Sequence, residues 1–373
     1  MPQRLPSTPP VLSGMTYQNP LGSGGFADVF LYRQDMPSRP VAIKVMLAHI
    51  EDPTVRRMFN SEADVLARLS SHPSILSIYD AGVSADGRPY IAMEYCPDSP
   101  GGRYRSEKLP INAVLDAGVR IACALETAHR VGVLHRDLKP SNILITEFGA
   151  PVLADFGIAT SLNKTAPTEE GAMSVPWSAP EVLTGATAGT VTSEVWGLGA
   201  TIYSLLAGRS PFEQAGGGGR NSRDQLERRI LKASYTPTGR TDVPASLEKV
   251  LARTMERDPQ KRYQSALEVA QALQGVQMEL GLAPTALDVP GANWNTQAVV
   301  VDDATAPPRG PIRPTVAAQS NRRKSSVSQT LNPVATNTQP TRKRQWGLVV
   351  AAIIAGVVLI AGAVVALVLT GVI

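Results

Sequence analysis

The first hundred residues alternate between apolar and polar positions with the short period typical of β-strands. Runs of this kind occupy residues 21–30, 41–45, 75–83 and 89–94, and turn-forming residues separate them. Glycines interrupt the first run, which therefore predicts a strand, a tight turn and a second strand. We expect this part of the chain to form a β-sheet.

Longer stretches with apolar residues at every third or fourth position predict helices. They lie at residues 54–70, 110–131, 194–206, 245–256 and 265–274. The stretch at 194–206 is apolar nearly all round, so we expect it at the centre of its domain. A strand-rich part followed by a helical part predicts an α+β fold with two lobes.

Both ends of the chain differ in composition from the rest. Residues 1–14 are polar and proline-rich, lack the apolar run of a signal peptide, and are expected to be disordered. Residues 276–345 are rich in Pro, Ser, Thr, Asn and Ala and hold few large aliphatic side chains, which predicts a disordered linker. The folded domain is therefore expected at residues 15–275.

The positive charge of the chain lies in the predicted linker. Residues 276–346 carry eight of the 36 basic and four of the 32 acidic residues, which accounts for the whole net charge of +4. The folded part is neutral, which argues against a nucleic-acid-binding protein. Cys96 and Cys123 form no CxxC pair and are expected to be free thiols in a reducing compartment.

The C-terminal residues predict a transmembrane helix at 346–373. Residues 347–373 are 27 positions without a charge, and a bilayer core needs about 20. Three basic residues at 342–344 and Trp346 precede this run, so we expect a single pass through the cell membrane with the rest of the chain on the cytoplasmic side. Small residues spaced four apart in this helix would allow a homodimer.

The stretch HRDLKPSN, from His135 to Asn142, and the tripeptide DFG, from Asp155, contain the candidate chemistry. Phosphoryl transfer needs an acceptor for a hydroxyl proton, a cation beside the moving phosphate and oxygen ligands for a metal ion. These two motifs resemble those of protein kinases, and the resemblance implies that Asp137 would deprotonate the substrate hydroxyl and Lys139 would neutralise the γ-phosphate of ATP. Asn142 and Asp155 would bind Mg²⁺ or Mn²⁺.

A glycine-rich turn is the candidate phosphate-binding loop, because glycines let the backbone approach phosphates and present N–H groups to them. Ala27 stands where the GxGxxG pattern has its third glycine, and its small methyl group is expected to shift the loop without preventing nucleotide binding. A Rossmann fold is disfavoured, since strand-like residues follow the glycines. The predicted nucleotide-contacting residues here are Leu21, Gly22, Ser23, Gly24, Gly25, Phe26, Ala27, Asp28 and Val29.

Lys44 lies inside the β-branched run at residues 41–45, and Glu62 follows in the next predicted helix. Glu62 is close to the apolar face of that helix, where an unpaired carboxylate would be costly. An ion pair between Lys44 and Glu62 would satisfy both groups and hold the lysine against the α- and β-phosphates of ATP. Asp64 is the alternative partner, on the more polar side of the helix.

In the order of these motifs, residues 21–275 resemble a eukaryotic-like protein kinase of the bacterial Ser/Thr class. Lys139 within HRDLKPSN is the residue that Ser/Thr kinases carry there. The resemblance implies an adenine pocket at the hinge between the lobes, with Met93 at its back and the backbone of residues 94–96 at the adenine edge. Met93 can equally serve as core filling. The pocket is predicted to include Ala42, Glu94, Cys96 and Leu144.

The resemblance also implies supporting residues around the catalytic loop. Glu181 of the APE motif is expected to pair with Arg262, as these two do in protein kinases. Glu194 stands where the family has an aspartate that supports the catalytic loop, and its longer side chain is expected to shift that support. A solvated charge is the alternative role for Arg262.

The segment between DFG and APE holds candidate regulatory hydroxyls. Thr165 and Thr168 lie in its middle, where a phosphate would add a charge of about −1.5 to −2 and could pair with Arg136. We therefore expect autophosphorylation at Thr165 or Thr168, with exposed but unmodified hydroxyls as the alternative. Ser174 lies close to APE and is assigned to substrate docking.

Together these patterns predict a membrane-anchored Ser/Thr protein kinase that uses ATP and modifies protein substrates. A pseudokinase that acts as a membrane-tethered scaffold is the alternative, left open by Ala27 and Glu194. A small-molecule phosphotransferase of related fold is disfavoured by the APE segment and the loop before it.

Overall fold

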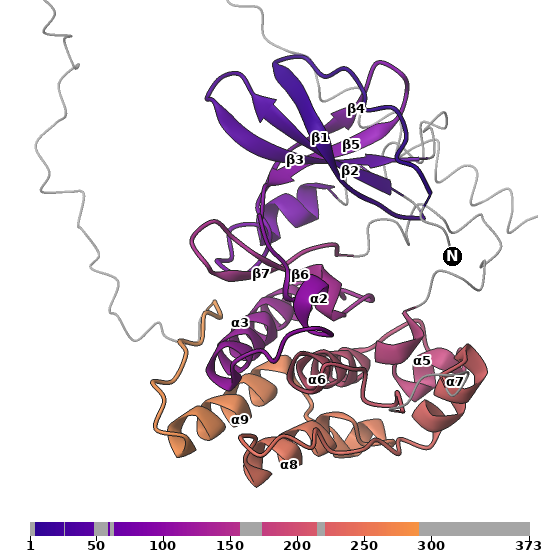
Figure 1. Cartoon of the computed structure of the whole chain (residues 1–373), viewed down its shortest axis with the longest axis vertical. Coiled ribbons are helices and arrows are strands. Elements are labelled where there is room, and N and C mark those ends of the chain that lie inside the picture. The colour runs from indigo at the N-terminus through magenta and orange to yellow at the C-terminus, as the bar shows by residue number, and fades with distance from the viewer. Residues whose placement is uncertain are drawn as a thin grey trace, which may run out of the picture. The chain divides into compact units, whose positions relative to one another are not determined.

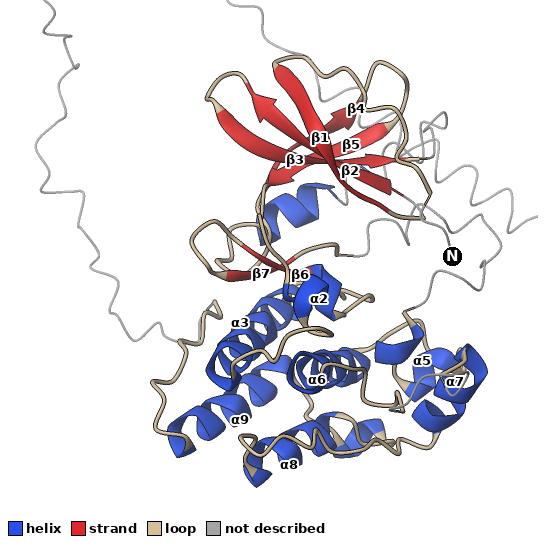
Figure 2. Ribbon diagram, in the orientation of Figure 1, coloured by secondary structure: helices blue, strands red, loops and turns tan. Residues whose placement is uncertain are grey.

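The computed structural model describes residues 4–25, 27–47, 59, 63–156, 174–214 and 221–290. Within these residues a β-sheet lies above a group of helices (Figure 1). Figure 2 shows that nearly all strands lie in this sheet and that the long helices lie in the group below it. The predicted α+β architecture is present, and we call residues 4–94 the small lobe and residues 98–290 the large lobe.

The small lobe is built on a five-stranded antiparallel sheet in the order β1-β2-β3-β5-β4. Each strand overlaps a run predicted from the alternating pattern, but β1 begins ahead of the first run, which starts at residue 21. They are β1 (Met15–Ser23), β2 (Ala27–Gln34), β3 (Arg39–Met46), β4 (Ile78–Val83) and β5 (Pro89–Glu94).

The two faces of this sheet have different neighbours, because successive side chains of a strand point to opposite sides. Val41, Ile43 and Val45 of β3 pack on one face together with Phe30 of β2. Ala42 packs on the other face, in an apolar cluster that includes side chains of the large lobe. The second face therefore lines the junction of the lobes.

The large lobe packs helices around α6, as the apolar pattern predicted. This helix begins with a capping box at Thr190 and ends before Gly208, which has a φ of 70° that suits glycine. Gly118 lets α3 pack closely, since a Cβ there would lie 3.0 Å from Leu273 of α9. The large-lobe elements are α2 (Pro100–Arg103), α3 (Ile111–Arg130), η1 (Pro140–Asn142), β6 (Ile143–Ile145), β7 (Pro151–Leu153), η2 (Val175–Trp177), α5 (Pro180–Leu183), α6 (Val191–Ala207), α7 (Arg223–Leu231), α8 (Ala245–Thr254), η3 (Pro259–Lys261) and α9 (Ala266–Glu279).

Residues 276–290 belong to the folded unit, so the predicted start of the linker at residue 276 is wrong. Helix α9 continues to Glu279, and Val289 is buried. The Thr285 hydroxyl donates to the Asp116 carboxylate at 2.8 Å, and the Thr285 N–H donates to the Gln277 side chain at 2.9 Å. These contacts tie a segment of polar composition to distant helices.

Residues 4–14 are also folded, contrary to the predicted disorder of residues 1–14. Leu12 is buried on the outer face of the sheet. The Tyr32 hydroxyl donates to the Pro10 carbonyl at 2.6 Å, and Arg88 donates to the Thr8 carbonyl at 2.7 Å. The proline-rich composition indicates little helix or strand, and side chains of the sheet fix the segment instead.

Truncation after Gln274 is expected to lower the free energy of unfolding, compared with truncation after Pro290. The shorter chain loses buried Val276 and Val289 and leaves the Asp116 carboxylate without Thr285. Two buried valines alone correspond to about 3 kcal/mol. Urea unfolding of the two truncated proteins measures the difference, and equal midpoints would show that residues 275–290 contribute nothing.

Within the described residues, no helix has the length and apolar character needed to span a bilayer. The predicted transmembrane helix at residues 346–373 and the predicted linker from residue 291 onward lie outside those residues.

Candidate active site

The loop between α3 and η1 positions Asp137, the predicted proton acceptor. The Lys139 ammonium lies 2.6 Å from an Asp137 carboxylate oxygen. The Asn142 amide donates to the Asp137 carbonyl at 2.6 Å and reaches the same carboxylate oxygen at 3.3 Å. The three polar residues predicted from HRDLKPSN therefore form one contact group, with the Asp137 carboxylate half-exposed at its edge.

Lys44 of β3 pairs with Asp155 of the DFG motif, and their side chains meet at 2.6 Å across the junction of the lobes. The Asp155 side chain is 43% exposed, and although loss of hydration at this junction would raise its pKa, Lys44 holds that pKa below its ordinary value, so the carboxylate stays ionised. The predicted ion pair between Lys44 and Glu62 stays a prediction, because Glu62 lies outside the described residues. The alternative partner, Asp64, is exposed.

The donor set of Asn142 and Asp155 fits a magnesium ion. The Asn142 nitrogen is used in hydrogen bonds to Asp137, which leaves the amide oxygen as a possible ligand. Among the described residues no group of three or more His, Cys, Asp or Glu side chains could hold a metal. Mg²⁺ is commonly bound by one or two side chains together with substrate phosphates and water, which matches a site of this kind.

His135 links the catalytic loop to the DFG segment, a role that the sequence motif did not reveal. Its ring is fully buried. The Nε2 atom lies 2.8 Å from the Ala154 carbonyl, and the Nδ1 atom accepts from the Asp137 N–H at 3.3 Å. One donor and one acceptor are what a neutral imidazole offers, and burial lowers the pKa of His135 accordingly.

The free energy of unfolding is expected to fall as the pH drops below about 6.5, the ordinary pKa of histidine. Below that value the unfolded chain takes up a proton that buried His135 resists, so stability is lost as the pH falls. The loss attributable to His135 should be roughly 1 kcal/mol between pH 6.5 and 5.5. Urea unfolding at both values measures it, and His135→Asn should show a smaller slope. Equal pH slopes in the two proteins would contradict this role.

Glu194 of α6 supports the catalytic loop through a hydrogen bond to its backbone. One carboxylate oxygen accepts the Arg136 N–H at 2.6 Å, and the other lies 2.6 Å from Nε2 of His129 on α3. Arg136 has a φ of 66°, a conformation that non-glycine residues adopt only when the surroundings hold it. The longer side chain of Glu194 thus reaches the loop backbone, and His129 is a partner that the sequence did not indicate.

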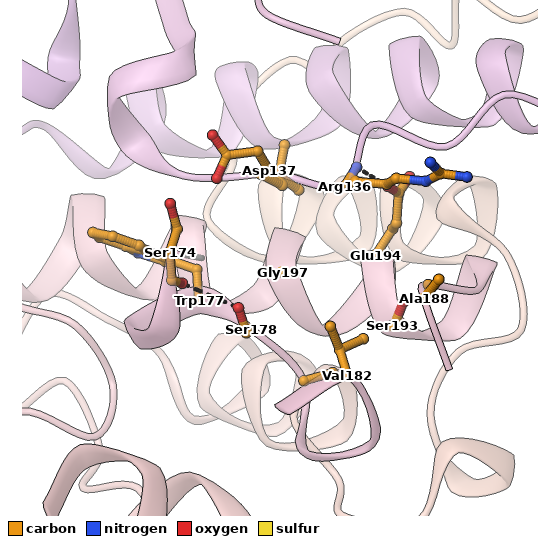
Figure 3. A pocket seen from close by; sticks show the side chains of 13 residues that line it. Arg136, Asp137, Ser174, Trp177, Ser178, Val182, Ala188, Ser193, Glu194 and Gly197 are labelled. Carbon is orange, nitrogen blue, oxygen red and sulfur yellow. Dashed lines mark hydrogen bonds between the residues drawn. The ribbon is translucent and has the colours of Figure 1, made fainter. Parts of the chain in front are cut away.

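A pocket next to Asp137 is formed by the catalytic loop, the segment before APE and α6 (Figure 3). The Ser174 hydroxyl accepts from the Lys139 ammonium at 3.0 Å. Trp177 lines the pocket and donates from its indole N–H to Ser204 of α6 at 3.0 Å. Ser174, assigned to substrate docking from its position near APE, is therefore in direct contact with the candidate catalytic group.

The predicted pair of Glu181 and Arg262 is present and buried. The two nitrogens of the guanidinium lie 2.6 and 2.9 Å from the two carboxylate oxygens. Arg262 also donates to the Thr192 and Glu256 carbonyls, and its guanidinium lies over the Trp196 ring. This ion pair joins α5, which carries Glu181, to the centre of the large lobe.

The predicted adenine-contacting side chains come together at the hinge. Ala42 and Met93 form an apolar cluster with Val152 and Ala154 of the large lobe. Burial, together with the nearby Glu94 carboxylate, raises the pKa of the Cys96 thiol to about 12, so it is a neutral apolar contact. Three more predicted residues pack against this cluster: Val29, Cys96 and Leu144.

The glycine-rich loop joins β1 to β2, as predicted. The Gly24 N–H donates to the Ala27 carbonyl at 2.9 Å, which closes the turn. Phe26 lies outside the described residues. Asp28, predicted to contact the nucleotide, is instead fully buried against residues of the N-terminal segment, and its carboxylate accepts from the Ser7 N–H at 2.7 Å.

A sheet-containing lobe, a helical lobe and this set of polar residues at their junction define a protein kinase. The chain belongs to the protein kinase family, whose domain matches residues 15–275. The family uses ATP and a divalent metal ion.

Curated relatives of this chain are bacterial Ser/Thr protein kinases. Serine/threonine-protein kinase PknK of Mycobacterium tuberculosis is 35% identical over 295 residues, which cover 77% of this chain and 26% of that protein. PrkC of Bacillus subtilis is 34% identical over 254 residues, covering 66% of this chain and 38% of PrkC. PknJ of Mycobacterium tuberculosis is 33% identical over 272 residues, covering 70% and 45%. The chain therefore spans less than half the length of these relatives.

Proposed function

We propose that this chain is a Ser/Thr protein kinase that transfers the γ-phosphoryl group of ATP to hydroxyl groups of protein substrates. The observation that carries the proposal is the convergence of Lys44, Asp155, Asp137, Lys139 and Asn142 at the junction of the lobes. Each is a residue that phosphoryl transfer requires, and each is held by a defined contact.

The chain's own side chains divide the chemistry between them. Asp137 accepts the proton of the attacking hydroxyl, and Lys139, 2.6 Å away, compensates the charge that develops at the transferred group. Lys44 supplies a cation for the α- and β-phosphates when ATP displaces part of its contact with Asp155. A magnesium ion held by Asn142 and Asp155 would neutralise the phosphate oxygens.

The experiment is transfer of label from γ-labelled ATP to a general protein substrate. The purified full chain should label the substrate with Mg²⁺ present and lose the label when the metal is chelated. Nucleotide binding with no transfer to the substrate or to the chain itself would instead indicate the pseudokinase scaffold.

The proposal places the kinase domain at the cytoplasmic face of the cell membrane, tethered by residues 346–373. The uncharged run at residues 347–373, which follows three basic residues, supports this. The full chain should stay in the membrane fraction after alkaline carbonate extraction, whereas a chain truncated after Pro290 should be released. Extraction of the full chain would refute the tether.

Autophosphorylation at Thr165 or Thr168 is proposed as the switch, and both lie outside the described residues. Arg136 directly precedes Asp137, and its side chain is exposed, so it is available to a phosphate. After incubation with ATP, mass spectrometry should find phosphate on one of the two threonines. The Thr165→Ala/Thr168→Ala variant should lose most of its activity. An unmodified loop, or a fully active double variant, would remove this switch.

A further inference from the structure

Residues 4–12, which we call the N-terminal strap, run back over the outer face of the small-lobe sheet. The chain reverses just before β1, where the Met15 N–H donates to the Leu12 carbonyl at 3.3 Å. Leu12 is buried against the sheet, and the Tyr32 hydroxyl donates to the Pro10 carbonyl at 2.6 Å. The last residues of the strap are thereby attached to the sheet.

Arg88, in the turn between β4 and β5, holds the middle of the strap. Its side chain is buried and donates to the Ser7 hydroxyl at 2.9 Å and to the Thr8 carbonyl at 2.7 Å. Asp86 neutralises the guanidinium at 2.6 Å. A buried guanidinium is stable only when its donors are satisfied, so the strap completes this site.

The first residues of the strap bind the glycine-rich loop itself. Arg4 forms an ion pair with Asp28, and the Ser7 N–H donates to the other Asp28 oxygen at 2.7 Å. The Ser23 hydroxyl donates to the Arg4 carbonyl at 3.1 Å, and the Arg4 guanidinium reaches the Gly24 carbonyl at 3.4 Å. Hydrogen bonds and an ion pair therefore link the strap to β1 and to β2, on both sides of the loop.

These ties lie on the face of the sheet away from the adenine pocket. Asp28 shares that face of β2 with Phe30 and Tyr32, whereas Val29 packs with the cluster at the hinge. A glycine-rich loop has little conformational preference of its own. The position of the loop over the phosphates consequently depends on the contacts that it makes with the strap on this face of the sheet.

We propose that the N-terminal strap is a positioning element for ATP, in which Arg4 and Asp28 hold the glycine-rich loop in its phosphate-binding place. The inference rests on the proposed nucleotide binding and extends it to the strap, whose residues 4–12 precede the family match at 15–275. Arg4 and Asp28 are positioning residues, because they act through the loop and not on the reacting atoms.

Loss of the tie should weaken ATP binding without slowing the chemical step. Without Arg4, the buried Asp28 carboxylate loses its counter-charge and the loop samples other positions. The KM for ATP and the Kd for a non-hydrolysable ATP analogue should each rise about five- to tenfold, a size typical of contacts between coupled residues. The kcat at saturating ATP should stay within about twofold, since Asp137 and Lys139 are untouched.

The test compares Arg4→Ala, Asp28→Asn and the double variant in the full chain, each with KM, kcat and Kd measured. The double variant should bind ATP about as weakly as the single ones, because both remove the same tie. Arg4→Lys should restore most of the affinity. Arg33→Ala is the matched control: Arg33 is exposed on β2 and bonds to Ser38, so its loss should leave KM unchanged.

Three results would overturn the proposal. The first is an unchanged KM and Kd in Arg4→Ala, and the second is additive effects on Kd in the double variant. The third is a loss of both kcat and thermal stability without a change in Kd. If Asp28→Asn fails to fold, Arg4→Ala with its lysine rescue decides the matter, since the Arg4 side chain is 45% exposed. A wild-type chain that binds no ATP analogue would refute the proposed function instead and would be seen before any variant is compared.

Discussion

Asp137→Asn is expected to abolish nearly all phosphoryl transfer while leaving the fold and nucleotide binding intact. The amide oxygen can still accept from Lys139, which lies 2.6 Å from the native carboxylate, so the loop geometry should persist. An amide cannot take the proton of the substrate hydroxyl. Loss of a general base typically costs about 100-fold or more in rate. The kcat for labelled phosphate transfer and the Kd of an ATP analogue measure the two halves of this prediction.

The control for this variant is Asp224→Asn, which removes an exposed carboxylate at the start of α7. It should retain the wild-type rate. An Asp137→Asn enzyme with more than about a tenth of wild-type kcat would show that Asp137 is not the proton acceptor. A matching loss of ATP-analogue binding would instead show that the substitution disturbs the site.

Arg262→Leu should cause the largest loss of stability among single substitutions of the described polar residues. The Arg262 side chain is fully buried and bridges Glu181 with the carbonyls of Thr192 and Glu256. Leucine leaves a carboxylate and these carbonyls without partners. Removing one member of a buried ion pair costs about 3–5 kcal/mol, a large share of the 5–15 kcal/mol that stabilises a typical domain.

Urea unfolding of the chain truncated after Pro290 measures this loss. Arg257→Leu provides the matched control, because Arg257 is exposed in the same segment and a surface change of this kind costs less than about 0.5 kcal/mol. A midpoint for Arg262→Leu equal to that of the control would mean that the buried pair contributes no stability.

The strands of the small-lobe sheet and the helices α3, α6, α8 and α9 could be predicted from the sequence because their patterns are local. The alternation at residues 89–94 and the apolar surface at 194–206 reappear as β5 and the central helix α6. The two domain limits could not be predicted, because the contacts that order them are distant. Thr285 bonds to Asp116 across 169 positions, and composition around residues 276–290 carries no sign of that partner.

In the candidate site, too, the grouping of residues that are close in the sequence could be predicted, and contacts between distant residues could not. The resemblance of HRDLKPSN to the protein-kinase motif predicted that Asp137, Lys139 and Asn142 act together, because the three lie within one run of eight residues. Lys44 contacts Asp155, 111 positions away, a pairing that the local pattern did not indicate, whereas the predicted pair with Glu62 lies outside the described residues and stays a prediction. Asp28 was grouped with the nucleotide because it lies in the glycine-rich loop, whereas strand alternation turns it to the opposite face.

Phosphoamino-acid analysis of a protein substrate labelled by the full chain from γ-labelled ATP tests the central claim most directly. The account predicts phosphoserine and phosphothreonine when Mg²⁺ is present, with neither formed by Asp137→Asn. An unlabelled substrate, label confined to tyrosine, or equal labelling by the Asp137→Asn variant would contradict it.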